Sequence, residues 1–429
     1  MNNHSNDDQV TLPRADAKER RLRRQELQFT RGASFASSQG GGFPFLFFLR
    51  REWRRITSRR IYLVAAVVLP LFLVFFMATI FGNGQMRHLP IGIVDGDNTS
   101  TSRSIVRNVD AVPTFDVVAH YADDAAARAA VQRREVYGYL SIPPRFEESM
   151  MRGTGATLCY YYHYALLAVG GEVMSAFETA LLPVRMAPIV EEAVMLGDTE
   201  ENIETFLLPM SSDDHALYNP SLDYAEYLAV PIFYIMFQIL ILLVTLYAVG
   251  SERKQVLQAV PLFSSRSSFF TAIVAKLLPF ALIFCLESML SSVVFFHWEH
   301  IPSVGHMGLF ALATVLFIIA TQSVAVILYT LFPVLSLVIS VVSMVGSLGA
   351  TLSGLTFPLS AMSPVVQYVA MLFPMRHFTE VMQSIVYFDG GFEACWPQLS
   401  VLCIYPLVTM ALFPRLRKIL LNNPYDTME

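Results

Sequence analysis

The stretch IYLVAAVVLPLFLVFFMATIFG, from Ile61 to Gly82, decides the fold class of this chain. It contains no charged residue, and at about 1.5 Å per residue a helix of this length covers roughly 33 Å, enough to cross the hydrocarbon core of a bilayer. A cleaved signal peptide would have a shorter apolar region closer to the N-terminus. We therefore expect residues 61–82 to form a transmembrane helix that stays in the protein.

Further apolar runs of similar length follow in the second half of the chain. They are Leu228 to Val249, Phe269 to Phe296, Gly308 to Leu331, Val334 to Phe357 and Leu399 to Leu416. Over all 429 residues, 54% are hydrophobic, 15% are charged and the mean hydropathy is +0.48, which excludes an ordinary soluble enzyme. The sequence predicts an α-helical integral membrane protein with six transmembrane helices, the last five within residues 221–416.

The charges are sorted between two compartments. Residues 1–60 hold 13 Lys and Arg against 6 Asp and Glu, whereas residues 83–220 hold 9 against 19. Arginines also precede the first span and follow the sixth, whereas the segment HWEHIPSVGH between the third and fourth spans has no Lys or Arg. By the positive-inside rule we expect a multi-pass protein of the cell inner membrane with both termini in the cytoplasm.

The ends of the chain are predicted to lie outside the bilayer. Residues 1–42 are polar and end in three glycines, which predicts a disordered cytoplasmic tail. Residues 417–429 are predicted to form a cytoplasmic tail at the other end of the chain. Residues 43–60, FPFLFFLRREWRRITSRR, mix aromatic residues with arginine and predict an amphipathic interfacial helix that contacts membrane lipids. An arginine cluster that only sets the topology of the first span explains the charges equally well.

Residues 83–220 form an insertion long enough for a core of its own. Short apolar runs alternate with helical patterns, which predicts an extracytoplasmic α/β domain. Asp95 and Asp97 fit a turn better than a cation site, and we expect no metal site and no catalytic residue. Cys159 and Cys395 would both face the oxidising side, so a disulfide between them is conceivable.

Two titratable residues lie inside the third predicted span. Lys276 is near its inner end and is expected to snorkel, whereas Glu287 is deeper and is a candidate for the transport pathway. The alternative for Glu287 is pairing with a neighbouring helix through Gln238 or Gln322. Gln238 is the second pathway candidate. The chain has no G-x-x-x-x-G-K-[ST] loop, so we expect no nucleotide cofactor to bind to it.

Three more segments carry candidate sites. Residues 252–260 predict a short helix between two spans, with an apolar stripe for a partner's groove. The fifth span has small residues four apart, which let helices pack closely. Prolines divide residues 358–388 into two short re-entrant helices, with Pro358, Arg376 and His377 as candidates for an outer gate. The coupling candidates are Glu252, Arg253, Lys254, Val256, Leu257 and Val260; the small residues are Ser343, Ser347, Gly349, Ala350 and Gly354.

Several of these segments resemble, in order and spacing, the permease subunits of ABC type-2 exporters with a large insertion after the first span. They are LYNPSLDYAEYLAVPI (217–232), GSERKQVLQAVPLFSSRSSFFTAIVAKLLPF (250–280), LSGLTFPLSAMSPVVQYVAMLFPMRHF (352–378), LPIGIVDGDNTSTSRSIV (89–106) and IPPRFEESMMRGTGATL (142–158). The resemblance implies that residues 252–260 contact cytosolic ABC ATPase subunits, which would bind ATP and Mg. It also implies that the fifth span lies at the interface with a second permease copy or a homologous permease.

The predicted function is therefore an export permease without enzymatic activity of its own. A periplasmic adaptor is a further expected partner, and nucleic acid is not one. The alternative function is a membrane-anchored receptor or assembly scaffold whose outer domain binds a ligand. A bound ATP-hydrolysing subunit would discriminate the two.

Overall fold

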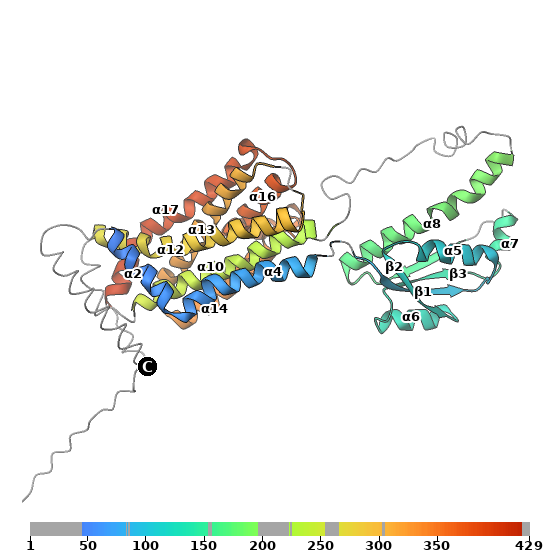
Figure 1. Cartoon of the computed structure of the whole chain (residues 1–429), viewed down its shortest axis with the longest axis horizontal. Coiled ribbons are helices and arrows are strands. Elements are labelled where there is room, and N and C mark those ends of the chain that lie inside the picture. Colours follow the sequence, from blue (N-terminus) through green and yellow to red (C-terminus); the bar gives the residue numbers. More distant parts are fainter. Residues whose placement is uncertain are drawn as a thin grey trace, which may run out of the picture. The chain divides into compact units, whose positions relative to one another are not determined.

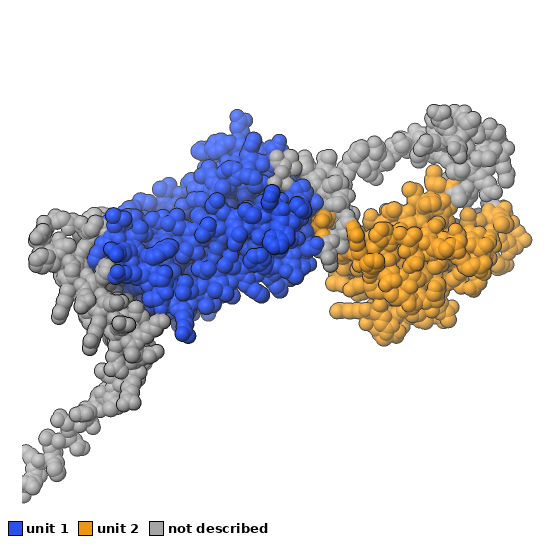
Figure 2. Space-filling view, viewed as in Figure 1, with its two compact units in different colours: residues 1–82, 224–429 blue, residues 83–223 orange. Residues whose placement is uncertain are grey.

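The computed structural model describes residues 45–82, 84, 86–152, 157–195, 223, 225–253, 266–302 and 305–422. The chain divides into two compact units (Figure 2). Unit 1 consists of residues 1–82 and 224–429, and unit 2 of residues 83–223, a range close to the predicted insertion 83–220. The predicted tail 1–42 lies outside the described residues.

Unit 1 is a bundle of helices (Figure 1). Five of its described helices are long and apolar enough to cross a membrane, in agreement with a helical membrane protein. They span Arg60–Phe81, Ala225–Glu252, Phe269–Trp298, Met307–Leu331 and Phe392–Leu421. The first of these long helices consists of α3 (Arg60–Leu63), a π-helical turn and α4 (Leu69–Phe81). The second contains α10 (Val230–Arg253), which follows a π-helical turn, and the third contains α12 (Arg266–Val293), which a π-helical turn follows. The last two are α13 (Met307–Leu331) and α17 (Phe392–Asn422).

The remaining helices of unit 1 are shorter. α2 (Phe45–Ser58) corresponds to the predicted interfacial helix. α14 (Leu335–Thr351) has 17 residues, and it is followed by a single 3₁₀ turn (Leu359–Ala361), α15 (Pro364–Ala370) and α16 (Pro374–Val386). Prolines stand at the starts of α15 and α16, where a missing backbone N–H costs nothing.

Two predicted boundaries differ from the structure. The predicted span 334–357 ends as a helix at Thr351, because Gly354 takes a φ of +84° that turns the chain away. The predicted tail 417–429 is helical at its beginning, since α17 continues to Asn422. Leu416 and Leu420 are fully buried in the same apolar cluster as Phe48 of α2, so this turn belongs to the bundle.

Two apolar clusters hold unit 1 together. α13 packs against α10, α12, α16 and α17 and contributes to both clusters. In the first cluster the rings of Phe317 and Phe378 stack with their centroids 4.3 Å apart. The ring centroid of Tyr234 of α10 lies 4.8 Å from that of Phe378. Such aromatic contacts fix the helices in one arrangement where the surrounding lipid would supply no hydrophobic driving force.

Unit 2 is a four-stranded sheet with helices on both faces. The strands are β1 (Leu89–Asp95), β2 (Phe115–Tyr121), β3 (Gly138–Ile142) and β4 (Cys159–Tyr162), in the order β2-β1-β3-β4. β1 pairs in parallel with β2 and β3, and β4 pairs antiparallel with β3. The helices are α5 (Ser100–Asp110), α6 (Asp124–Gln132), α7 (Phe146–Met151) and α8 (Leu167–Met195).

The core of unit 2 follows from its alternating strand residues. Ile91 and Ile93 of β1 are fully buried beneath α5 and α8, together with Phe177 of α8. On the other face Val94 and Tyr139 pack against Ala127 of α6. All four cysteines are free, so the conceivable disulfide between Cys159 and Cys395 is not formed in this structure.

A buried ionic cluster as candidate functional site

Five charged side chains from three helices meet inside unit 1, and we call them the ionic cluster. They are Arg51, Glu52 and Arg55 of α2, Glu252 of α10 and Lys276 of α12. The two carboxylates and the ammonium group are almost inaccessible to solvent, at 1–4% exposure for each residue. Charges this deep are retained only when they pair with each other.

The spacing of α2 explains why two of its charges point inward. Phe48, Glu52, Arg55 and Ile56 recur at helical intervals and form the buried face, so Glu52 and Arg55 stand between two apolar side chains. The outer face carries Arg50, Trp53 and Arg54 among others.

Lys276 joins the two carboxylates. Its Nζ lies 2.7 Å from Glu52 Oε2 and 2.7 Å from Glu252 Oε1. The guanidinium groups complete the cluster: Arg51 Nη2 lies 2.9 Å from both carboxylate oxygens of Glu252, and Arg55 Nη1 also pairs with Glu252. Each helix is thereby tied to the other two by charge-assisted hydrogen bonds.

The charges in the cluster depend on one another. Burial raises the pKa of the Glu52 carboxyl, but Lys276, Arg55 and Arg51 outweigh burial and lower it to about 2. The Glu52 carboxyl is therefore ionised at neutral pH, and the cluster as a whole holds three basic residues against two acidic ones. Lys276 was expected to snorkel to the surface; instead its carboxylate partners hold it inside the bundle.

The cluster stands at the start of the predicted coupling segment. Glu252 and Arg253 are the last residues of α10. The remaining coupling candidates Lys254, Val256, Leu257 and Val260 lie outside the described residues. Since Glu252 is anchored, any displacement of the segment that follows it would act directly on α2 and α12.

The sequence pattern alone does not single out Glu52. It assigns the arginines of residues 43–60 either to an interfacial helix or to the topology of the first span. A signal was present, because Glu52 is the one acidic residue among six arginines between residues 45 and 63. An acid placed on the apolar stripe of such a helix indicates an internal partner.

Glu287 lies apart from the ionic cluster, near the C-terminal end of α12. It is 4% exposed, and neither carboxylate oxygen has a hydrogen-bond partner in the described part of the chain. Neither glutamine is recorded as its partner: the amide of Gln322 donates to the Leu277 carbonyl at 3.3 Å, and Gln238 lies against Gly349. The next residue, Ser288, shares a hydrogen bond of 2.8 Å with the Tyr234 hydroxyl.

The small residues of α14 separate onto two faces. Gly349 is buried, and a Cβ there would lie 3.1 Å from Gln238 of α10, so it packs within the subunit. Ser343 and Ser347 are exposed on the subunit surface, and their hydroxyls donate to the helix carbonyls of Ile339 and Met344. Of the other candidates, Ala350 is half-buried and Gly354 lies beyond the helix end.

The three candidates for an outer gate lie in different surroundings. His377 of α16 is buried, with one ring nitrogen facing Gln398 of α17 and the other 2.9 Å from the Met371 carbonyl. Arg376 pairs with Glu380 on its own helix, and Pro358 is exposed before the 3₁₀ turn. His377 therefore fixes α16 against α17, whereas Arg376 stays at the surface.

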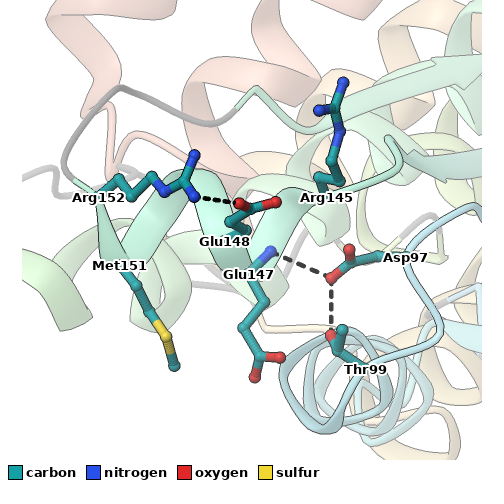
Figure 3. Close-up of a pocket in the computed structure, with 7 residues that line it drawn as sticks. All are labelled: Asp97, Thr99, Arg145, Glu147, Glu148, Met151 and Arg152. Carbon is teal, nitrogen blue, oxygen red and sulfur yellow. Dashed lines mark hydrogen bonds and ion pairs between the residues drawn. The ribbon is translucent and has the colours of Figure 1, made fainter.

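Unit 2 has a shallow cavity of about 470 Å³ (Figure 3). It lies beyond the carboxyl ends of β1 and β3, the position at which open α/β sheets bind ligands. The Asp97 carboxylate lies at the N-terminal end of α7. It accepts hydrogen bonds from the Thr99 hydroxyl and from the backbone N–H groups of Phe146 and Glu147. Burial raises the pKa of the Asp97 carboxyl, but the hydrogen bonds that it accepts together outweigh burial and lower this pKa. Asp95 accepts from the backbone of the following turn, as predicted, and the described residues hold no cluster that fits a metal.

Comparison with known proteins identifies the class. Residues 60–413 match the ABC-2 family transporter proteins, and the chain belongs to this family. Among its relatives are the inner membrane transport permease YhhJ of Escherichia coli (strain K12) and that of Shigella flexneri, each 30% identical over 137 residues. The match covers 31% of this chain and 36% of each relative, so the chain spans about a third of the length of the curated relatives. The resemblance seen in the sequence is confirmed: the chain is a multi-pass membrane protein of the ABC-2 transporter family.

Proposed function

We propose that this chain is the permease subunit of an ABC exporter of the inner membrane, moved by separate ATPase subunits. α14 then serves as the sixth, short membrane crossing, both termini face the cytoplasm, and unit 2 is the extracytoplasmic domain. The charge sorting between residues 1–60 and 83–220 supports this orientation. The active assembly contains two permease subunits, identical or homologous, and unit 2 offers a surface for a periplasmic adaptor.

The ionic cluster is the observation that carries the coupling part of the proposal. Force applied to the segment after Glu252 passes through ion pairs to Glu52 of α2 and to Lys276 of α12. Because α2 leads directly into the first span, such a force reaches three helices at once. A loop that merely joined two spans would need no buried charges at its start, since burying them is costly.

Copurification tests the proposal. The tagged chain, extracted from its native membrane, should carry a stoichiometric ATP-hydrolysing subunit, and hydrolysis should follow the complex through size exclusion. Absence of such a subunit would overturn the proposal and favour the receptor or scaffold.

The coupling role has its own test. The Glu252→Gln variant should retain bound ATPase but lose most of the stimulation of hydrolysis that the permease provides. An exposed control, Arg107→Gln of unit 2, should behave as wild type. Full stimulation in Glu252→Gln would contradict a coupling role for the cluster.

A further inference from the structure

The outer face of α2 combines exposed apolar and cationic side chains. Leu46 is 72% exposed and Trp53 is 51% exposed, and Arg50 lies between them on the same stripe of the helix. Arg54 and Thr57 continue this stripe toward Arg60, at which the first span begins. We call these residues the outer stripe of α2.

The outer stripe contains arginines and no acidic residue of its own. Glu52, the one acid between residues 45 and 63, is buried on the opposite face and is paired with Lys276. Even the ionic cluster behind the stripe holds three basic residues against two acidic ones. More cations, Arg415 and Lys418, lie at the end of α17, whose Leu416 and Leu420 share an apolar cluster with Phe48 of α2.

This combination fits a lipid surface that bears negative headgroups. Tryptophan and leucine partition into the boundary between headgroups and acyl chains, while arginine beside them remains at the level of the phosphates. Anionic lipids attract such residues by about a fivefold gain in affinity for each arginine. A purely electrostatic protein contact would not require the two large exposed apolar side chains.

We propose that the outer stripe of α2 selectively binds anionic lipid headgroups through Arg50 and Arg60, with Trp53 inserted beside them. The inference rests on the proposed position of α2 at the inner leaflet. Its consequence for transport is direct, because the same helix holds Glu252 from its other face. Lipid charge thereby acts on Glu252, the first residue of the predicted coupling segment.

Tryptophan fluorescence provides the test, since the chain has only three tryptophans. In a W298F/W396F background, the emission comes from Trp53 alone. The protein is reconstituted into vesicles of equal phosphatidylglycerol and phosphatidylcholine, with brominated chains on one lipid or on the other. We expect brominated phosphatidylglycerol to quench Trp53 severalfold more strongly than brominated phosphatidylcholine.

Charge variants make the test specific. R50Q/R60Q should bring the two quenching efficiencies together without changing the thermal midpoint, because neither residue belongs to the ionic cluster. The matched control R107Q/R185Q removes two exposed arginines from unit 2 and should preserve the selectivity.

Three results would overturn the inference. They are equal quenching by both lipids in the parent protein, selectivity that persists in R50Q/R60Q, and quenching of Trp53 by aqueous iodide but by neither lipid. The assay contains no ATPase subunit, so its failure would leave the proposed export function standing. Failure to find an ATPase would in turn leave the lipid result unaffected.

Discussion

At the scale of single residues, the ionic cluster is sensitive because its members compensate one another. Glu252 faces Arg51, Arg55 and Lys276, whereas Lys276 faces two carboxylates. Removing a partner from a buried pair leaves an uncompensated charge, which typically costs about 3–5 kcal/mol. The net charge that remains in the cluster decides which substitution destabilises unit 1 more.

We predict that Glu252→Gln destabilises unit 1 more than Lys276→Gln. The first substitution leaves three cations against Glu52, whereas the second leaves two cations and two anions. Thermal unfolding in detergent micelles measures both. The double variant should be more stable than the sum of the single effects by about 1–3 kcal/mol, and strict additivity would mean that the two residues do not interact.

The pH dependence of stability should isolate Glu52. Since its pKa is lowered to about 2 in the folded state, its contribution is complete above the unfolded pKa of about 4.5 and is lost as the pH falls toward 2. The shift corresponds to about 3 kcal/mol. The stability difference between wild type and Glu52→Gln should therefore shrink as the pH falls from 4.5 toward 2; a difference that grows over this range would contradict the assignment.

At the scale of elements, sequence patterns predicted where helices form better than they predicted which helices pack against each other. The apolar runs located the long helices, and the alternation of short apolar runs with helical patterns located an α/β domain, because burial imposes its period directly on the sequence. Lys276 and Glu52 show the limit of this approach. Their pairing depends on which helices become neighbours, and no local pattern encodes that choice.

The small residues of α14 illustrate the same limit. Their spacing indicated close helix packing but not which face meets which partner. Gly346 and Gly349 lie against Ile239 and Gln238, whereas Gly250 of α10 lies against Leu335, so α10 and α14 pack antiparallel within the subunit. If the proposed pair of permease subunits meets at α14, its exposed serines Ser343 and Ser347 are the small residues left for that interface.

We predict opposite outcomes for two substitutions in α14. Gly346→Leu places a Cβ only 2.7 Å from Ile239 Cγ1, which is too close for two carbon atoms. This substitution should therefore destabilise the subunit by about 1–3 kcal/mol. Ser347→Leu should leave subunit stability unchanged but weaken association between permease copies, because a large side chain separates closely packed helices. Thermal unfolding and cysteine crosslinking measure the two effects; an intact dimer in Ser347→Leu would remove this face from the interface.

A prediction at the same scale concerns α16 and α17. His377→Ala removes a buried side chain that contacts Gln398 and the Met371 carbonyl, which should cost about 1–3 kcal/mol and speed hydrogen exchange in residues 364–386. Arg376→Gln breaks only a surface pair with Glu380 and should change stability by less than about 1 kcal/mol. Equal effects of both substitutions would show that His377 does not fix the two helices.

At the scale of the whole molecule, the two units differ in where they place their apolar side chains. Unit 1 exposes many large apolar side chains on its outer surface, such as Phe72 and Leu286, as a protein solvated by lipid does. Unit 2 instead buries its apolar residues between a sheet and flanking helices, as a water-soluble domain does. Its stability should therefore be independent of the membrane.

A fragment comprising residues 86–195 should accordingly fold alone and unfold cooperatively in urea. Phe177 is central to this expectation, because it is fully buried and its ring lies 4.6 Å from that of Phe115 and 5.2 Å from that of Tyr160. Phe177→Ala should cost the fragment about 3–5 kcal/mol, whereas Val118→Ala, at a residue that is 51% exposed, should cost less than about 0.5 kcal/mol. Circular dichroism during urea titration measures both. A fragment without a cooperative transition would mean that unit 2 depends on contacts with the rest of the chain, and its ligand cavity could then be studied only in the complete permease.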